Sequence, residues 1–132
     1  MIRIGIDVGG TKIDAVAVAN DGMAGAVIAS LQKHNLKPIP VTGQDATPQG
    51  VQYILAGWQT GTVYKYVPLE ANAVAAAAVA LLHHQKPKTN SFRMNGKKKE
   101  PTLVIPVSWI TKKNYQQLFT QGWLKKSEVC IG

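Results

Sequence analysis

Apolar runs that end at a polar turn, each followed by apolar residues at helical spacing, constrain the fold of this chain more than any other feature. Residues 15–18 form such a run and end at the turn 20–22, as is typical of a buried parallel strand. From Ala24 to Leu31 the apolar residues then fall at i, i+3, i+4 and i+7, which predicts one face of a helix.

The same alternation continues along the rest of the chain. The further elements that we expect are a strand at 39–42, a helix from Pro48 to a C-cap at Gly57, a strand at 62–67, a helix at 69–84, a loop or hairpin at 86–100, a strand at 103–105, and a short helix capped by Asn114 and ended by Gly122. Alternating strands and helices favour an α/β fold, an open and mostly parallel sheet with flanking helices. No internal repeat is present.

Composition excludes several other classes of protein. With 45% hydrophobic and 17% charged residues, a chain of 132 residues can bury a core and is not a disordered tail. The single cysteine, Cys130, excludes an internal disulfide and a cysteine-rich zinc site, and we expect no cofactor or metal. The first residues lack the pattern of a signal peptide, so the chain as written is expected to stay in the cytoplasm.

A formal charge of +8 raises the question of nucleic-acid binding. The lysines concentrate at 86–99 and 112–126, without interleaved aromatic residues and without a recognised DNA-binding module. This pattern is typical of a solvated basic surface, and we expect no nucleic-acid partner.

Polar residues follow three of the expected strands, where open α/β sheets bind their ligands. They include Asn20 with Asp21, then Asp45, then Lys65. Taken singly, each has an ordinary explanation: turn or helix-cap residues for the first three, and a solvated lysine for the last. Together they place an amide, a carboxylate and an ammonium group at one sheet edge, the mixture of donors and acceptors that a sugar requires.

The segments around these residues resemble those of a known family. Residues 19–25, 43–46 and 59–65 are similar, in order and spacing, to three strand-end motifs of the periplasmic pentose-binding family of xylose type. Residues 94–96, 105–107 and 126–129 resemble its last strands and terminus. The resemblance covers about residues 14–130.

This resemblance implies a partial C-terminal lobe of a type I periplasmic binding protein, not an enzyme. Asn20, Asp45 and Lys65 would then be pentose contacts, with no catalytic residue and no cofactor. The family has a second, N-terminal lobe that this sequence lacks, so we expect weak pentose binding by this chain alone. Implied partners are that lobe or a second copy of the chain, and a membrane permease of an ABC sugar transporter. The family itself is periplasmic.

Two expectations concern apolar side chains. The three tryptophans fall outside the contact motifs, and we predict packing roles for Trp58, Trp109 and Trp123. The helix 69–84 carries almost no charge and is too apolar to lie bare in water, which predicts self-association through it.

Residues 1–13 have a separate resemblance, to the first phosphate-binding hairpin of the actin-like ATPase superfamily, as in sugar kinases and hydantoinases. There, Asp7 would lie near a metal, and Gly9 and Gly10 would let backbone N–H groups approach a phosphate. No catalytic-base or adenosine motif follows. We therefore expect a boundary between 1–13 and 14–132. The alternative function is a fragment of an actin-like sugar kinase that uses the loop 5–11. The other interpretation of residues 1–13 is a strand and a turn that only contribute to the sheet.

Overall fold

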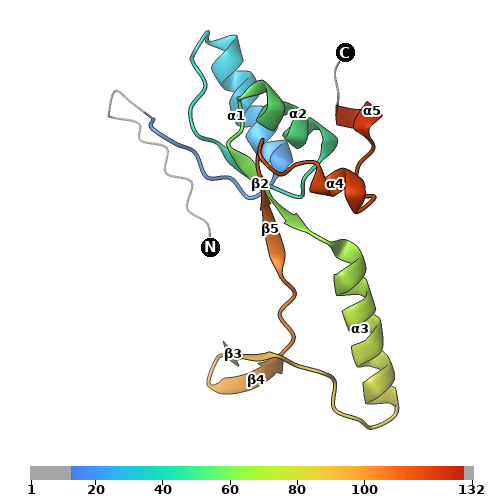
Figure 1. The fold of residues 1–132 in the computed structure, drawn as a ribbon. Helices are drawn as coiled ribbons and strands as arrows, with labels where there is room; N and C mark the ends of the chain where they lie inside the picture. Colours follow the sequence, from blue (N-terminus) through green and yellow to red (C-terminus); the bar gives the residue numbers. More distant parts are fainter. Residues whose placement is uncertain (1–12, 130–132) are drawn as a thin grey trace. The chain divides into compact units, whose positions relative to one another are not determined.

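A three-stranded sheet, in the order β1-β2-β5, is the base on which the other elements of the first unit pack (Figure 1). The computed structural model describes residues 13–129. They divide into two units, the first made of residues up to Tyr64 and from Ser108 onward, the second of Lys65–Val107. Among the described residues, none of the helices combines the length and the apolar character that a membrane span needs.

The strands of this sheet are β1 (Thr42–Gln44), β2 (Gly61–Lys65) and β5 (Val107–Ile110). β1 and β2 are parallel, with Thr42 opposite Gly61 and Gln44 opposite Val63. Parallel neighbours need a crossover, which α2 (Pro48–Ala56) provides. The carboxyl ends of β1 and β2 therefore lie at the same edge of the sheet.

Local sequence signals set the ends of the two long helices of this unit. Asn20 caps α1 (Asp21–Lys33), where its side chain accepts a hydrogen bond of 2.8 Å from the N–H of Met23. Thr47 caps α2, Pro48 occupies its first turn, and Gly57 ends it in the left-handed conformation with φ 84°. The predicted helix from Pro48 to Gly57 is confirmed.

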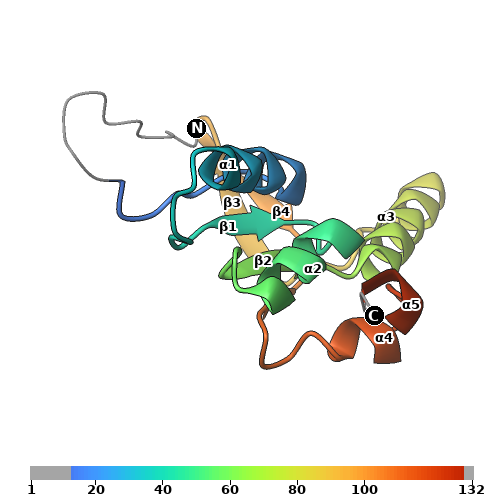
Figure 2. The ribbon, with the colours of Figure 1, turned by 90° about the horizontal axis from the view of Figure 1, so that it is seen from above.

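The core of the first unit lies where α1 and α2 pack side by side on the sheet (Figure 2). Val18, Ala24, Ile28 and Val41 form a buried cluster, and Trp58 packs against it as predicted. Two short helices, α4 (Gln117–Thr120) and α5 (Lys126–Val129), complete the unit. They bury Leu118 and Val129, and the backbone carbonyl of Glu128 accepts a hydrogen bond of 2.8 Å from the Gln52 side chain of α2.

The second unit contains α3 (Val67–Leu82) and a hairpin of β3 (Ser91–Asn95) and β4 (Lys98–Thr102). The strands are antiparallel, with Phe92 opposite Pro101, and Gly96 adopts φ 62° in the turn between them. The expected helix at 69–84 is thus present, and the segment 86–100 forms a hairpin. No residue of α3 is buried.

One expected strand is reduced to a single bridge. In place of a strand at 15–18, Val16 alone forms a parallel bridge with Val41. The N–H of Val16 donates to the carbonyl of Pro40 at 2.8 Å, and the carbonyl of Val16 accepts from the N–H of Thr42 at 3.1 Å. The N–H of Val18 donates to the side-chain oxygen of Thr42 at 3.3 Å, so the ladder of backbone bonds stops there.

Two other predictions were wrong for the same reason, a side-chain amide that satisfies backbone groups. The segment 103–105 is not a strand, because the Asn90 amide donates to the carbonyl of Val104 at 3.0 Å and accepts from its N–H at 2.8 Å. Asn114 does not cap a helix. Its oxygen accepts from the N–H of Thr111 at 2.8 Å and closes a turn, so that α4 begins only at Gln117.

The side chain of Asp21, 2% exposed, connects three segments of the first unit. One carboxylate oxygen accepts from the backbone N–H of Thr47 at 2.8 Å and from its hydroxyl at 3.2 Å. The other accepts from the Gln59 amide at 2.9 Å. A buried carboxylate is stable only when hydrogen bonds compensate the lost hydration, and these donors come from the start of α2 and the approach to β2.

Two glycines leave the space that this carboxylate occupies. A Cβ added to Gly43 or to Gly50 would overlap the Asp21 side chain far inside van der Waals contact. β1 and α2 therefore approach Asp21 closely because neither carries a side chain at these positions.

Replacing Asp21 by Ala should destabilise the chain by about 2–4 kcal/mol, because the N–H and hydroxyl of Thr47 lose their acceptor and the Gln59 amide keeps only the carbonyl of Gly61. Urea unfolding followed by circular dichroism measures this change. Asp14→Ala, at an exposed position, is the matched control and should change stability by less than about 0.5 kcal/mol. Equal effects of the two substitutions would show that the Asp21 contacts do not stabilise the fold.

Gly50→Ala should destabilise the chain by about 1–3 kcal/mol, because the new methyl group overlaps the Asp21 carboxylate. Gly25→Ala is the control: it also lies buried in a helix, but its added Cβ would meet Tyr53 and Gln49 at ordinary distances of 3.5 and 3.6 Å. That change should be neutral or stabilising, since alanine favours helices. The same unfolding assay compares them, and an unaffected Gly50→Ala variant would contradict the account.

Candidate functional site

The corner that follows β1 has an unusual backbone conformation. Asp45 and Ala46 adopt φ angles of 98° and 48°, the left-handed region that favours glycine. Such residues cost about 1–3 kcal/mol each and persist only where surrounding contacts hold them. They are also found preferentially at ligand-binding positions.

Three hydrogen bonds from different segments hold this corner. The N–H of Asp45 donates to the carbonyl of Val63 at 2.8 Å, and the N–H of Ala46 donates to the Thr62 hydroxyl at 3.2 Å. The indole N–H of Trp123 donates to the carbonyl of Ala46 at 2.9 Å. β2 and the C-terminal segment thus impose the conformation on the corner, and the Asp45 side chain starts from a fixed backbone.

Asn20 and Asp45 lie at the same end of the first unit. Asn20 caps α1, and its oxygen is engaged by the N–H of Met23. Asp21, the next residue, binds Thr47, which follows Asp45 by two positions. The Asp21 contacts therefore hold the start of α1 beside the corner after β1.

Lys65 is the last residue of β2. It follows Val63, which accepts the N–H of Asp45, by two positions. Like Asn20 and Asp45, it is half-buried. An amide, a carboxylate and an ammonium group thus come from the start of α1, the end of β1 and the end of β2.

Sequence reasoning missed how Asp21 and Trp123 support these residues. The sequence singles out Asp21 as a polar residue after an apolar run, with a turn or cap role as the ordinary explanation. It does not show that the glycines at 43 and 50 leave room for the Asp21 side chain. The predicted packing role of Trp123 is confirmed, since its ring lies 5.5 Å from that of Tyr64, centroid to centroid. Its hydrogen bond to Ala46 had no sequence signal, because 77 positions separate the two residues.

Trp109 borders a hollow on the first unit. A Cβ on Gly61 would overlap its indole ring, so the ring lies directly over that glycine. The hollow has a volume of about 400 Å³, and its lining includes Ala17, Ala19 and Val63. Trp109 remains 42% exposed there, so one side of the ring lies in contact with solvent.

No group of histidine, cysteine, aspartate and glutamate side chains suited to holding a metal occurs within residues 13–129. The phosphate-loop residues 5–11 and Cys130 lie outside the described residues. The structure places polar side chains at the cap of α1 and at the carboxyl ends of β1 and β2, and open α/β sheets bind their ligands at that edge.

Comparison with known proteins identifies the relatives of this chain. A periplasmic binding protein domain matches residues 8–86, and no comparison supports the resemblance of residues 1–13 to actin-like kinases. The D-xylose-binding periplasmic protein of Escherichia coli (strain K12) is 38% identical over 120 residues, which make up 89% of this chain and 36% of that protein.

Solved structures agree with this match. A carbohydrate transporter solute-binding protein from Chloroflexus aurantiacus, in complex with D-glucose, is 35% identical with a TM-score of 0.78, over 86% of this chain and 34% of that one. An ABC transporter solute-binding protein from Clostridium phytofermentans with bound β-D-glucose is 26% identical with a TM-score of 0.81, over 92% and 39%. The chain spans only about a third of the length of these relatives. It is an α/β partial lobe of the type I periplasmic binding protein fold, and it belongs to the periplasmic binding protein domain family.

Proposed function

We propose that this chain forms one side of a pentose-binding cleft, with Asn20, Asp45 and Lys65 as its contacts to the sugar. The observation that carries this proposal is the strained corner at Asp45 and Ala46. Strain of this kind is retained where it positions a functional group, and here three hydrogen bonds maintain it. The side chain that it positions is the carboxylate of Asp45.

The three side chains suit adjacent sugar hydroxyls. The carboxylate of Asp45 accepts hydrogen bonds from two hydroxyl groups, and the ammonium of Lys65 donates to hydroxyl or ring oxygens. The oxygen of Asn20 already caps α1, so its NH₂ group is the part that a sugar would contact. The relatives support a monosaccharide of this size, since one is named for D-xylose and two hold glucose.

We further propose that a second lobe completes the cleft, as the length of the relatives suggests. Exposed apolar surface supports a need for further polypeptide, both at Trp109 and along α3. In this proposal the chain is part of a solute-binding component that lies outside the cytoplasm. There it binds pentose and delivers the sugar to a membrane permease. It has no catalytic role, no cofactor and no nucleic-acid partner. The boundary between residues 1–13 and 14–132 remains part of the proposal.

The sugar site can be tested by NMR titration of the 132-residue chain with D-xylose. Binding should be weak, with a dissociation constant in the millimolar range, because one side of a cleft supplies only part of the hydrogen bonds, at about 0.5–1.5 kcal/mol each. The amide signals of Asp45, Ala46 and Lys65 should shift most. A micromolar dissociation constant for a proven monomer would contradict the proposal that a second lobe is needed.

Two substitutions and one other ligand serve as controls in this titration. Asp45→Ala should abolish the shifts, whereas Lys98→Ala, at an exposed position of β4, should leave them unchanged. Equal effects of the two would show that the sugar contacts are assigned wrongly. Mg-ATP should shift none of the amides 20, 45 and 65, and selective shifts in residues 5–11 would instead support the phosphate-loop alternative.

A further inference from the structure

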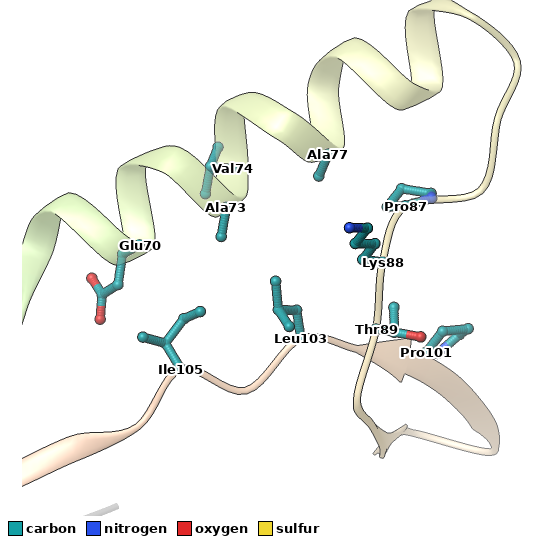
Figure 3. Close-up of a pocket in the computed structure, with 10 residues that line it drawn as sticks. All are labelled: Glu70, Ala73, Val74, Ala77, Pro87, Lys88, Thr89, Pro101, Leu103 and Ile105. Carbon is teal, nitrogen blue, oxygen red and sulfur yellow. The ribbon is translucent and has the colours of Figure 1, made fainter.

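The two units differ in how much of their contact surface lies within this chain. In the second unit, α3 and the segment with Leu103 and Ile105 leave a groove of about 520 Å³ between them (Figure 3). The second lobe proposed above would cover this surface, so the groove belongs to that contact. In the first unit, the groups that bind the corner at Asp45 and Ala46 come from the chain itself, and Trp123 is one of them.

Trp123 reaches the two strand ends that carry the proposed charged contacts to the sugar. Its indole N–H donates to the carbonyl of Ala46, the residue after Asp45, at 2.9 Å. Its ring also packs against that of Tyr64, at 5.5 Å between centroids and with the two planes tilted by 52°. Tyr64 is buried and directly precedes Lys65 in β2. One side chain therefore contacts the neighbours of both Asp45 and Lys65.

The backbone that carries this indole is anchored on its own account. The N–H of Trp123 donates to the carbonyl of Leu118 at 2.9 Å, and the N–H of Leu124 donates to the same carbonyl at 3.2 Å. The side chains of both leucines are buried. The indole thus projects from a fixed point, and its hydrogen bond restrains the corner rather than following it.

The peptide group between Ala46 and Thr47 is held at both of its polar atoms. Its carbonyl accepts from the indole of Trp123 at 2.9 Å, and its N–H donates to the carboxylate of Asp21 at 2.8 Å. Rotation of this peptide group would break both bonds. Because Asp45 and Ala46 have positive φ angles, which other contacts must maintain, this double restraint acts where the backbone most needs it.

We infer that Trp123 is a positioning residue of the sugar site. It fixes the peptide group between Ala46 and Thr47 and packs on Tyr64, and in this way it holds the Asp45 carboxylate and Lys65 in the arrangement that binds the sugar. This inference rests on the proposed sugar site and adds to it a side chain that does not itself contact the sugar. The affinity for pentose then depends on an indole N–H that lies 77 positions along the chain from Ala46.

The test is the dissociation constant for D-xylose of Trp123→Phe, measured by NMR titration of the complete 132-residue chain. Phenylalanine keeps a ring beside Tyr64 but has no N–H, so the carbonyl of Ala46 loses its donor. The dissociation constant should rise on the order of threefold to tenfold, which corresponds to the loss of one hydrogen bond. The titration observes folded chains, so a merely structural role of Trp123 would lower stability and leave this constant unchanged.

Trp58→Phe is the matched control, because the Trp58 ring packs against the buried cluster of Val18 and Ile28. It should leave the dissociation constant unchanged. The indole N–H signal of Trp123 is a second readout in the wild-type chain. It should shift with D-xylose along the same titration curve as the amide of Asp45, and it should not shift in Asp45→Ala.

The outcomes separate this inference from the proposed function. A folded Trp123→Phe variant that binds D-xylose as well as the wild type overturns the inference and leaves the sugar site in place. If that variant does not fold, a wild-type indole signal that stays fixed while the amide of Asp45 shifts overturns it equally. A wild-type chain that does not bind D-xylose overturns the sugar site itself, and this inference with it.

Discussion

The carboxylate of Asp21 accepts hydrogen bonds from Thr47 and Gln59, and this buried contact determines where the segments of the first unit meet. Through it the start of α1 is tied to the start of α2 and to the residues that lead into β2. The glycines at 43 and 50 are part of the same arrangement, since any side chain there would displace the carboxylate. The strand ends that carry the proposed sugar contacts are positioned by this network.

The corner at Asp45 and Ala46 depends on that positioning. Its left-handed backbone is maintained because Val63, Thr62 and Trp123 each bind it, and these partners come from β2 and from the C-terminal segment. The conformational free energy that the positive φ angles of Asp45 and Ala46 cost is offset by these hydrogen bonds from the rest of the unit. Stability and the proposed function are therefore linked: the contacts that hold the fold also fix the carboxylate that would bind the sugar. The second unit differs, because α3 buries no residue among those that the structure describes.

Much of this fold could be predicted from sequence because its signals are local. Pro48 and Gly57 mark α2, and alanine-rich spacing marks α3. Polar residues after apolar runs mark the cap of α1 at Asn20 and the ends of β1 and β2 at Asp45 and Lys65. The errors arose where a side chain replaced a backbone partner, as Asn90 does at Val104. The contacts that position the site were not predictable, because they join residues far apart in sequence, 26 positions for Asp21 and Thr47. The resemblance of residues 1–13 to kinases found no support in relatives.

Amide hydrogen exchange at Thr47 tests most directly whether Asp21 holds this unit together. Thr47 precedes α2, and its N–H donates to the carboxylate of Asp21 at 2.8 Å. Its protection therefore reports on that contact rather than on a helix or sheet ladder. If Asp21 holds the unit together, this amide should exchange only on global unfolding, as slowly as amides in the centre of α1. Exchange at the rate of an exposed loop would show that the contact opens freely, and would contradict the central place given to Asp21.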